Sequence, residues 1–321
     1  MIEYVLFLIG ILILIKGANL LVEGSSTLAY RMKVPTLVIG LTLVAFGTSL
    51  PELIVNIFAA IKGSTDIAFG NIIGSNIANI LLVLGIVSII SPIKIKRPTI
   101  WKEIPFCLLA VVVLFIASNY LLIDKININS LTKVSGIIFL CFFVIFLYYT
   151  VNLAKKSKRQ LDKGDVEIKT HSGRKIFLMV FVGLVCLYFG GKWIVDGAVL
   201  AAKQLGLSEF LISATILAIG TSLPEVITGI TAARKKETGL AVGNVLGSNI
   251  FNIFWILGVT ALIAPIVIPQ FINMDMIFLG GVTFLLFLFL FIGKKHELEK
   301  WQGIIFILLY IFYIVFIVIR G

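Results

Sequence analysis

The sequence predicts an all-α integral membrane protein with ten transmembrane helices in two inverted-topology repeats of five. Three observations lead to this fold class. Of the 321 residues, 60% are hydrophobic and only 13% are charged, and the mean hydropathy is +1.11, whereas about a quarter of a soluble chain is charged. Ten apolar runs are long enough to cross a bilayer, and one polar motif occurs twice. The same composition excludes a disordered chain and a small disulfide-bonded scaffold.

Each of the apolar runs approaches the length of about 20 residues that a transmembrane helix needs. In chain order they occupy residues 3–24, 36–61, 67–91, 103–121, 131–153, 176–199, 209–233, 239–263, 275–292 and 301–319. The first run has no preceding basic segment and is too long for the apolar part of a signal peptide. We therefore expect all ten runs to be membrane helices of the mature chain.

A polar stretch, residues 154–175, separates a first half, residues 1–153, from a second half, residues 176–321. Because cytoplasmic loops are enriched in Lys and Arg, placing this linker inside also places about 20 of the 27 basic residues inside. We expect a multi-pass protein of the cell membrane with a cytoplasmic linker and both termini extracellular. The net charge of +11 is then an orientation signal, and no nucleic-acid partner is expected.

One motif divides the chain into two related halves. Residues 47–52, Gly-Thr-Ser-Leu-Pro-Glu, recur 173 positions later as residues 220–225, and the same offset aligns residues 70–79 with residues 243–252. The two copies, within residues 40–85 and 213–258, each cover two adjacent runs. Because five runs separate a run from its copy, the copies cross the membrane in opposite directions. Such inverted repeats are typical of secondary transporters, which bind their substrate near the midplane between the repeats.

The repeated motif predicts a broken helix inside the membrane. Pro51 and Pro224 lack a backbone N–H and clash with the carbonyl groups of Gly47 and Gly220, four residues earlier. Free carbonyl oxygens at this depth must be satisfied by protein, water or a cation. Four hydroxyl groups stand beside the breaks, and oxygen is the ligand that hard cations such as sodium and calcium prefer. They belong to Thr48, Ser49, Thr221 and Ser222.

Glu52 and Glu225 directly follow the prolines. An acidic residue at the centre of a bilayer costs about 2.5–3.5 kcal/mol on insertion scales, and it is tolerated when it faces a cavity and meets a cation. The structural alternative is a pair of acids that face water at helix ends, or that pack between helices in protonated form. The doubled break favours the cation site. For Lys16, also inside a run, we expect snorkelling or a pair with Glu23.

The second run of each repeat adds a polar stripe. Asn71, Ser75 and Asn79 are spaced four apart and share one helix face, and Asn244, Ser248 and Asn252 repeat the pattern. Their amide and hydroxyl groups offer neutral oxygens to a cation, and interhelical hydrogen bonding is the alternative. Asn71, Asn76, Asn244 and Asn249 are the weakest candidates as ligands. The glycine pairs at 70 and 74 and at 243 and 247 indicate close helix packing.

With these motifs in view, the chain resembles the cation/calcium antiporter superfamily, and within it the sodium/calcium exchangers of prokaryotic type. The resemblance implies a secondary active antiporter, not an enzyme, that exchanges sodium for calcium by alternating access without a cofactor or a protein partner. It implies that runs 3–24 and 176–199 slide across the core. The ion-binding positions that it implies, the alanines through their backbone carbonyls, are Ala45, Thr48, Ser49, Glu52, Ser75, Asn79, Ala218, Thr221, Ser222, Glu225, Ser248 and Asn252.

Two departures from the family pattern limit what is expected. Some members, including potassium-dependent exchangers, carry an aspartate where this chain has Asn252, so its site holds two formal negative charges and potassium coupling is not expected. The linker is also too short for the calcium-sensing domains of animal exchangers, so regulation by such a domain is not expected.

Three other functions were weighed. A calcium/proton or other cation/proton antiporter is the main alternative, because two nearby carboxylates bind protons more tightly. An intramembrane enzyme with Ser49 or Ser222 as nucleophile would need a base, and the two histidines, His171 and His296, lie far from the motifs by topology. A channel fits less well, because inverted broken helices suit alternating access better than an open pore.

Overall fold

The computed structural model describes residues 2–119, 130–156, 171–204, 218–269 and 271–320. Within these ranges, eight helices are long and apolar enough to cross a membrane, and a ninth candidate is a pair of helices that meet at a bend of 43°. The expected helical membrane protein is therefore confirmed. The predicted run 209–233 begins outside the described residues, and most of the linker 154–175 also lies outside them. The number of ten spans therefore stays a prediction.

The helices follow the predicted runs closely, with π-helical turns (η) where the ladder of hydrogen bonds widens by one residue. The first half contains α1 (Ile2–Met32), α2 (Thr36–Ile39), η1 (Gly40–Val44), α3 (Ala45–Thr48), α4 (Leu50–Ile61), α5 (Thr65–Ala78), η2 (Asn79–Val83), α6 (Leu84–Ile90), α7 (Arg97–Trp101), α8 (Glu103–Ser118) and α10 (Lys133–Lys156). The second half contains α11 (Gly173–Gln204), α13 (Ala218–Thr221), α14 (Leu223–Arg234), α15 (Thr238–Ile250), η4 (Phe251–Ile256), α16 (Leu257–Ile263), α17 (Ile272–Phe289) and α18 (Lys300–Arg320).

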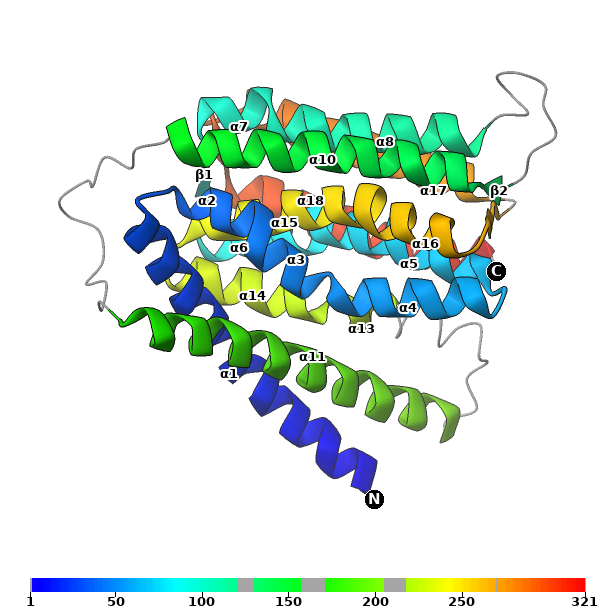
Figure 1. Ribbon diagram of the computed structural model, residues 1–321, viewed down its shortest axis with the longest axis horizontal. Coiled ribbons are helices and arrows are strands. Elements are labelled where there is room, and N and C mark those ends of the chain that lie inside the picture. Colours follow the sequence, from blue (N-terminus) through cyan, green and yellow to red (C-terminus); the bar gives the residue numbers. More distant parts are fainter. Residues whose placement is uncertain (1, 120–129, 157–170, 205–217, 270, 321) are drawn as a thin grey trace.

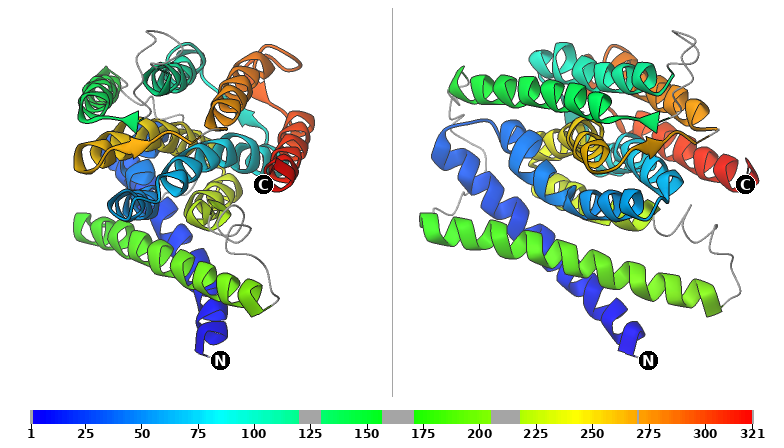
Figure 2. Two further views of the ribbon diagram at one scale, coloured as in Figure 1. Left: turned by 90° about the vertical axis from the view of Figure 1, so that its right-hand side faces the viewer. Right: turned by 45° about the vertical axis from the view of Figure 1, so that its right-hand side comes forward.

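The helices form three layers (Figures 1 and 2). The long helices α1 and α11 pack against each other on one side of the molecule, and α8, α10 and α17 cover the opposite side. The repeat elements, α2–α6 and α13–α16, lie between these two layers. The start of α1 and the end of α18 lie at one end of the bundle, and the helix ends that flank residues 157–170 lie at the other end (Figure 1).

Two short antiparallel strand pairs connect the halves in a reciprocal way. β1 (Ile93–Lys94), which follows α6, pairs with β4 (Glu297–Leu298), which precedes α18. β3 (Ile266–Val267), which follows α16, pairs with β2 (Ser130–Leu131), which precedes α10. In each half, the strand that follows the polar-stripe helix is therefore hydrogen-bonded to a strand of the other half.

Helix α1 is eight residues longer at its C-terminal end than the predicted run 3–24. The extra turns contain Ser25, Ser26 and Thr27, whose side chains are all buried. Thr27 Oγ1 donates to the Glu23 carbonyl oxygen at 2.7 Å. A hydropathy scan ends at these polar residues because it assumes a lipid environment, whereas here protein covers them.

Close backbone contacts hold α1 against α11. A Cβ atom added to Gly17 would lie 2.9 Å from the Gly183 carbonyl oxygen, and one added to Gly190 would lie 2.9 Å from the Gly10 carbonyl oxygen. Such distances are shorter than ordinary van der Waals contacts, which lie at about 3.5–4.0 Å between carbon atoms. Only glycine permits this approach, and the two helices therefore pack as one unit.

Candidate functional site

Both copies of the motif break their helices as the prolines predict. Helix α3 ends at Thr48 and α4 begins at Leu50, while Ser49 between them has ψ near 4°. Ser222 adopts nearly the same conformation between α13 and α14, with ψ near 0°. Each proline lies in the first turn of the new helix, where its missing N–H leaves no intrahelical bond unmade. Both breaks lie about halfway along the bundle (Figure 1).

The two acids lie in the first turns of the helices after the breaks. Glu52 in α4 and Glu225 in α14 are each only 1% exposed. The Ser75 hydroxyl lies 3.5 Å from Oε1 of Glu52, and the Ser248 hydroxyl lies 3.5 Å from Oε1 of Glu225. The Oε2 atom of each acid is buried without a hydrogen-bond partner. Both acids therefore present an oxygen atom that a bound cation could use.

Three of the four hydroxyl groups beside the breaks, those of Thr48, Thr221 and Ser222, contact the polar stripe of the other repeat. Thr48 Oγ1 donates to Asn244 Oδ1 at 3.1 Å, and Thr221 Oγ1 donates to Asn71 Oδ1 at 3.0 Å. Ser222 Oγ donates to Ser75 Oγ at 3.0 Å. Interhelical hydrogen bonding, the alternative considered for the stripe, is therefore the role of Asn71 and Asn244 in this structure.

Four asparagines form a second reciprocal set. Asn79 Nδ2 donates to Asn249 Oδ1 at 3.0 Å, and Asn252 Nδ2 donates to Asn76 Oδ1 at 2.9 Å. Asn76 and Asn249 also donate to each other's backbone carbonyl oxygens, at 3.4 and 3.3 Å. These bonds use the NH₂ groups of Asn79 and Asn252 and leave their Oδ1 atoms buried without a partner. Both amides thus present an oxygen that a cation can use.

The site contains several buried oxygen atoms that have no hydrogen-bond partner. Nearly all buried polar groups in folded proteins are hydrogen-bonded, and exceptions need an explanation such as an unseen ion. Five of the predicted site residues each carry one buried side-chain oxygen without a partner: Ser49, Glu52, Asn79, Glu225 and Asn252. Within the described ranges, no group of three or more His, Cys, Asp or Glu residues is placed to hold a metal. A cation here would therefore have two carboxylates and several neutral oxygens, a set that suits hard cations.

The repeats are not identical in this arrangement. Ser49 Oγ is unpartnered, whereas Ser222 Oγ donates to Ser75. The Ala45 carbonyl oxygen accepts the backbone N–H of Ser49 at 3.0 Å and lies 3.5 Å from the Thr48 hydroxyl, which also donates to it. Ala218 is the first residue of α13, and its side chain lies outside the described part.

Two further residues were missed by the sequence reasoning. Asn56, one turn beyond Glu52 in α4, has a buried and unpartnered Oδ1, and Thr228, one turn beyond Glu225 in α14, has a buried and unpartnered hydroxyl. Both face the same direction as the acid that precedes them, because residues three or four apart share a helix face. This spacing was the available signal, and it was not used because the two positions do not match at the repeat offset.

Glycine brings the two repeats together at the site. A Cβ atom on Gly243 would lie 2.3 Å from the Leu37 carbonyl oxygen and 3.0 Å from the Gly40 Cα, and one on Gly247 would lie 2.8 Å from the Leu41 carbonyl oxygen. The expected close packing is therefore present in α15. In contrast, a Cβ atom on Gly70, the counterpart of Gly243, meets nothing within 4 Å.

A buried, oxygen-lined centre between two broken helices is the kind of site that a cation transporter needs. The family model described as "Sodium/calcium exchanger protein" matches residues 2–152 and 175–319. The chain therefore belongs to the sodium/calcium exchanger protein family, and the expected resemblance is confirmed.

Individual relatives agree with this family. The chain is 36% identical to "Putative antiporter CaxA" of Alkalimonas amylolytica over 95% of both chains, and 32% identical to "Sodium/calcium exchanger MaX1" of Methanosarcina acetivorans over 98% of both. Among solved structures, the sodium-calcium exchanger NCX_Mj soaked with 2.5 mM Na⁺ and 1 mM Sr²⁺ is 33% identical, with a TM-score of 0.82 over 98% of both chains. These relatives are transporters, in keeping with the expectation that the chain is not an enzyme.

Proposed function

We propose that this chain is a secondary active antiporter that exchanges sodium for calcium by alternating access. In this proposal Glu52 and Glu225 bridge one calcium ion between the repeats. The remaining ligands come from the predicted hydroxyl, amide and carbonyl oxygens, and sodium ions occupy the same and adjoining oxygens in the alternative state. The ions are transported substrates, and no cofactor takes part.

The observation that carries the proposal is the set of five buried and unpartnered oxygens. They come from both repeats, and two of them belong to the buried carboxyl groups of Glu52 and Glu225. A divalent cation cancels both charges and satisfies the orphan oxygens together. A purely structural pair of acids would leave the unpartnered oxygens of Asn79 and Asn252 unexplained. The names of the exchangers NCX_Mj and MaX1 favour sodium and calcium as the ions.

The charge balance gives a reason for coupled exchange. The empty site holds two buried carboxylates, and uncompensated charges at this depth are costly. A chain in this state changes access slowly, whereas calcium or several sodium ions neutralise the site and permit the change. A ligand shifts the equilibrium between two states only through its different affinities for them. Calcium and sodium therefore bind at one site in alternation, and neither ion crosses the membrane without the other being transported in the opposite direction.

The proposed topology has ten spans in two inverted repeats, with residues 1–153 and 176–321 as the two halves. The reciprocal contacts between motif copies and the reciprocal strand pairs support this arrangement. The linker 154–175 is cytoplasmic and both termini are extracellular in the cell membrane. In support, the helix ends that flank residues 157–170 lie at the opposite end of the bundle from the start of α1 and the end of α18 (Figure 1). Helices α1 and α11 slide across the core between the two access states.

Calcium uptake into proteoliposomes tests the function. Vesicles loaded with sodium chloride are diluted into sodium-free buffer that contains labelled calcium, and potassium-loaded vesicles are the reference. We expect rapid uptake only with the outward sodium gradient. A parallel measurement with a pH gradient in sodium-free buffer tests the calcium/proton alternative. Uptake driven by the pH gradient and indifferent to sodium would replace sodium coupling with proton coupling.

Two glutamine variants test the site. Removing one partner of a buried charge interaction costs about 3–5 kcal/mol, which corresponds to about a hundredfold or more in calcium affinity. We expect Glu52→Gln and Glu225→Gln each to abolish uptake. The control is Glu103→Gln in α8, because Glu103 is also 1% exposed but bonds to the Tyr149 hydroxyl, away from the breaks. Normal uptake by either test variant would refute the site assignment.

A further inference from the structure

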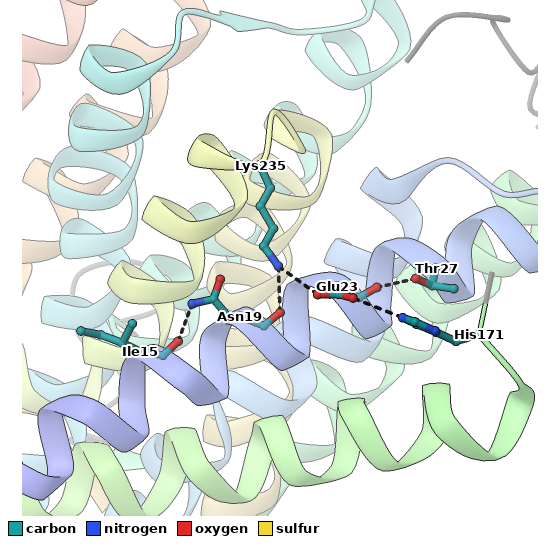
Figure 3. Close-up of polar contacts among 6 residues, drawn as sticks. All are labelled: Ile15, Asn19, Glu23, Thr27, His171 and Lys235. Carbon is teal, nitrogen blue, oxygen red and sulfur yellow. Dashed lines mark hydrogen bonds and ion pairs between the residues drawn. The ribbon is translucent and has the colours of Figure 1, made fainter. Parts of the chain in front are cut away.

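A cluster of charged side chains lies at the linker end of the bundle, apart from the candidate ion site. Glu23 of α1 lies between two cationic or potentially cationic groups (Figure 3). His171 Nε2 is 3.2 Å from Glu23 Oε1, and Lys235 Nζ is 3.4 Å from Glu23 Oε2. Lys235 also donates to the Asn19 carbonyl oxygen at 3.2 Å. The sequence led us to consider Lys16 as a partner of Glu23, but the partners come from distant parts of the chain.

The cluster connects two different bodies. His171 lies two residues before the first residue of α11, and Glu23 belongs to α1, so both belong to the unit in which these helices pack glycine against glycine. Lys235 immediately follows α14 and belongs to the repeat core. The two contacts of Lys235, with Glu23 and with the Asn19 carbonyl, therefore fasten the α1/α11 unit to the core at this end.

Helix α14 leads from the candidate ion site to this cluster. Glu225 lies in its first turn and Lys235 directly follows its last residue, so the two are about 15 Å apart at 1.5 Å per residue. Thr228, with its unpartnered buried hydroxyl, lies one turn from Glu225 on the way to Lys235. The α1/α11 unit covers this helix from end to end, because Gly191 of α11 approaches Pro224 and Glu23 of α1 contacts Lys235.

We propose that Glu23, His171 and Lys235 form a gate that closes the access path between Glu225 and the linker side, and that protonation of His171 loosens it. The proposal rests on the proposed transport function, in which the α1/α11 unit moves over the core. The three residues position the helices and do not bind the transported ion. While the contacts to Lys235 hold, the unit stays over α14; when they break, the unit is free to leave it.

The direction of the pH effect follows from the charges around His171. With a neutral imidazole, Lys235 is the cation that balances Glu23 within the described contacts. Protonation adds a second cation on the opposite carboxylate oxygen, which repels Lys235 and neutralises part of the charge of Glu23, so an acidic linker side weakens the contact between Glu23 and Lys235. Further basic groups are Arg31 of α1, which lies against Gly173, and the exposed Arg174 and Lys175 at the start of α11. The acid Glu237 follows Lys235 by two residues.

A buried reporter cysteine measures the gate without any transported ion. In the full chain with Cys107, Cys141 and Cys186 replaced, Thr228→Cys places a thiol on α14 where the native side chain is fully buried. The protein is embedded in lipid nanodiscs, and the rate of labelling by a polar maleimide is followed by mass spectrometry. Because this rate at a fixed pH depends on access to the thiol and on no transported ion, it reports on the gate even if the chain proves to transport other ions.

Charge-neutralising variants and one matched control are made in this background. Partly exposed ion pairs contribute little individually, so we expect Glu23→Gln and Lys235→Gln to be labelled about two- to fivefold faster than the parent. Arg234→Gln removes the same charge from the neighbouring, exposed position and should be labelled at the parent's rate. Equal rates for Lys235→Gln and Arg234→Gln would overturn the gate.

The pH profile separates a gate from a merely structural contact. Because the intrinsic reactivity of the thiol also changes with pH, the parent is compared with His171→Gln at each pH. We expect equal rates at about pH 8, and a parent that is about two- to fivefold faster than His171→Gln at about pH 5.5, the range in which histidine changes charge. A ratio that is independent of pH would refute the role of His171. If a single variant does not fold, E23K/K235E replaces it: a rate near the parent's supports the gate, and a several-fold faster rate contradicts it.

Discussion

Replacing Gly243 by alanine tests whether close contact between the repeats builds the ion site. The added Cβ atom would lie 2.3 Å from the Leu37 carbonyl oxygen, 2.9 Å from the Leu41 N and 3.0 Å from the Gly40 Cα. These are backbone atoms, which no rotamer change can move away. Helix α15 must therefore shift by roughly 1 Å to restore ordinary contact distances. Overpacking of this kind costs about 1–3 kcal/mol.

The chain provides its own control for this variant. Gly70→Ala makes the equivalent change in the first repeat, where the added Cβ atom meets nothing within 4 Å. Both variants gain the same helix preference of alanine over glycine, about 0.5–1 kcal/mol. The free energy of unfolding of Gly243→Ala should therefore fall below that of Gly70→Ala by the overpacking cost alone, about 1–3 kcal/mol.

Two assays in parallel show the consequence. Thermal unfolding in detergent compares the stabilities, and sodium-driven calcium uptake compares the sites. Asn244, next to Gly243, accepts the hydrogen bond from Thr48 at 3.1 Å, so we expect Gly243→Ala to lose uptake as well as stability while Gly70→Ala keeps both. Equal melting temperatures for the two variants would refute the reasoning.

Three more predictions concern charge and topology. Arg320→Gln removes the partner that Asp275 binds at 2.9 and 3.1 Å. We expect a loss of about 3 kcal/mol in unfolding free energy, which the double variant D275N/R320Q should partly recover. A double variant no more stable than Arg320→Gln would contradict this role of the ion pair. Asn252→Asp loses the donor to Asn76 and adds a third negative charge. Without calcium its melting temperature should lie below the parent's, and added calcium should raise it by more than it raises the parent's. An equal rise for both proteins would argue against the site. Lys62 follows α4 in the first motif copy, and Lys236 follows α14 in the second copy. An impermeant reagent should label Lys62→Cys and Lys236→Cys from opposite sides of the membrane, and labelling from the same side would exclude inverted repeats.

The sequence was sufficient for the features that depend on local chemistry. Pro51 and Pro224 forecast both helix breaks because a missing N–H and a steric clash act within one turn. The burial of Glu52 and Glu225 followed from acids placed in apolar runs. The boundaries of most helices followed from hydropathy, and α1 was underestimated only where protein replaces lipid around Ser25 and Ser26.

The division of roles among the asparagines was not available from the sequence. Asn71 and Asn79 share a helix face and a residue type, yet Asn71 accepts a hydrogen bond from Thr221, whereas Asn79 donates to Asn249 and keeps a free oxygen. The role of each asparagine depends on its partner in the other repeat, about 150 or 170 residues away in the sequence. Rules of helical spacing do not predict such distant contacts. The contact of Glu23 with Lys235 was missed for the same reason.

The most direct test of the central claim is a crystal structure of the chain soaked in calcium. If Glu52 and Glu225 bridge one ion, a single strong density feature will lie between their unpartnered Oε2 atoms, with oxygen ligands at about 2.3–2.6 Å that include Oδ1 of Asn79 or Asn252. The same soak of Glu225→Gln should lack that feature. Calcium bound elsewhere, with the two carboxyl groups still facing each other unoccupied at saturating calcium, would contradict the account.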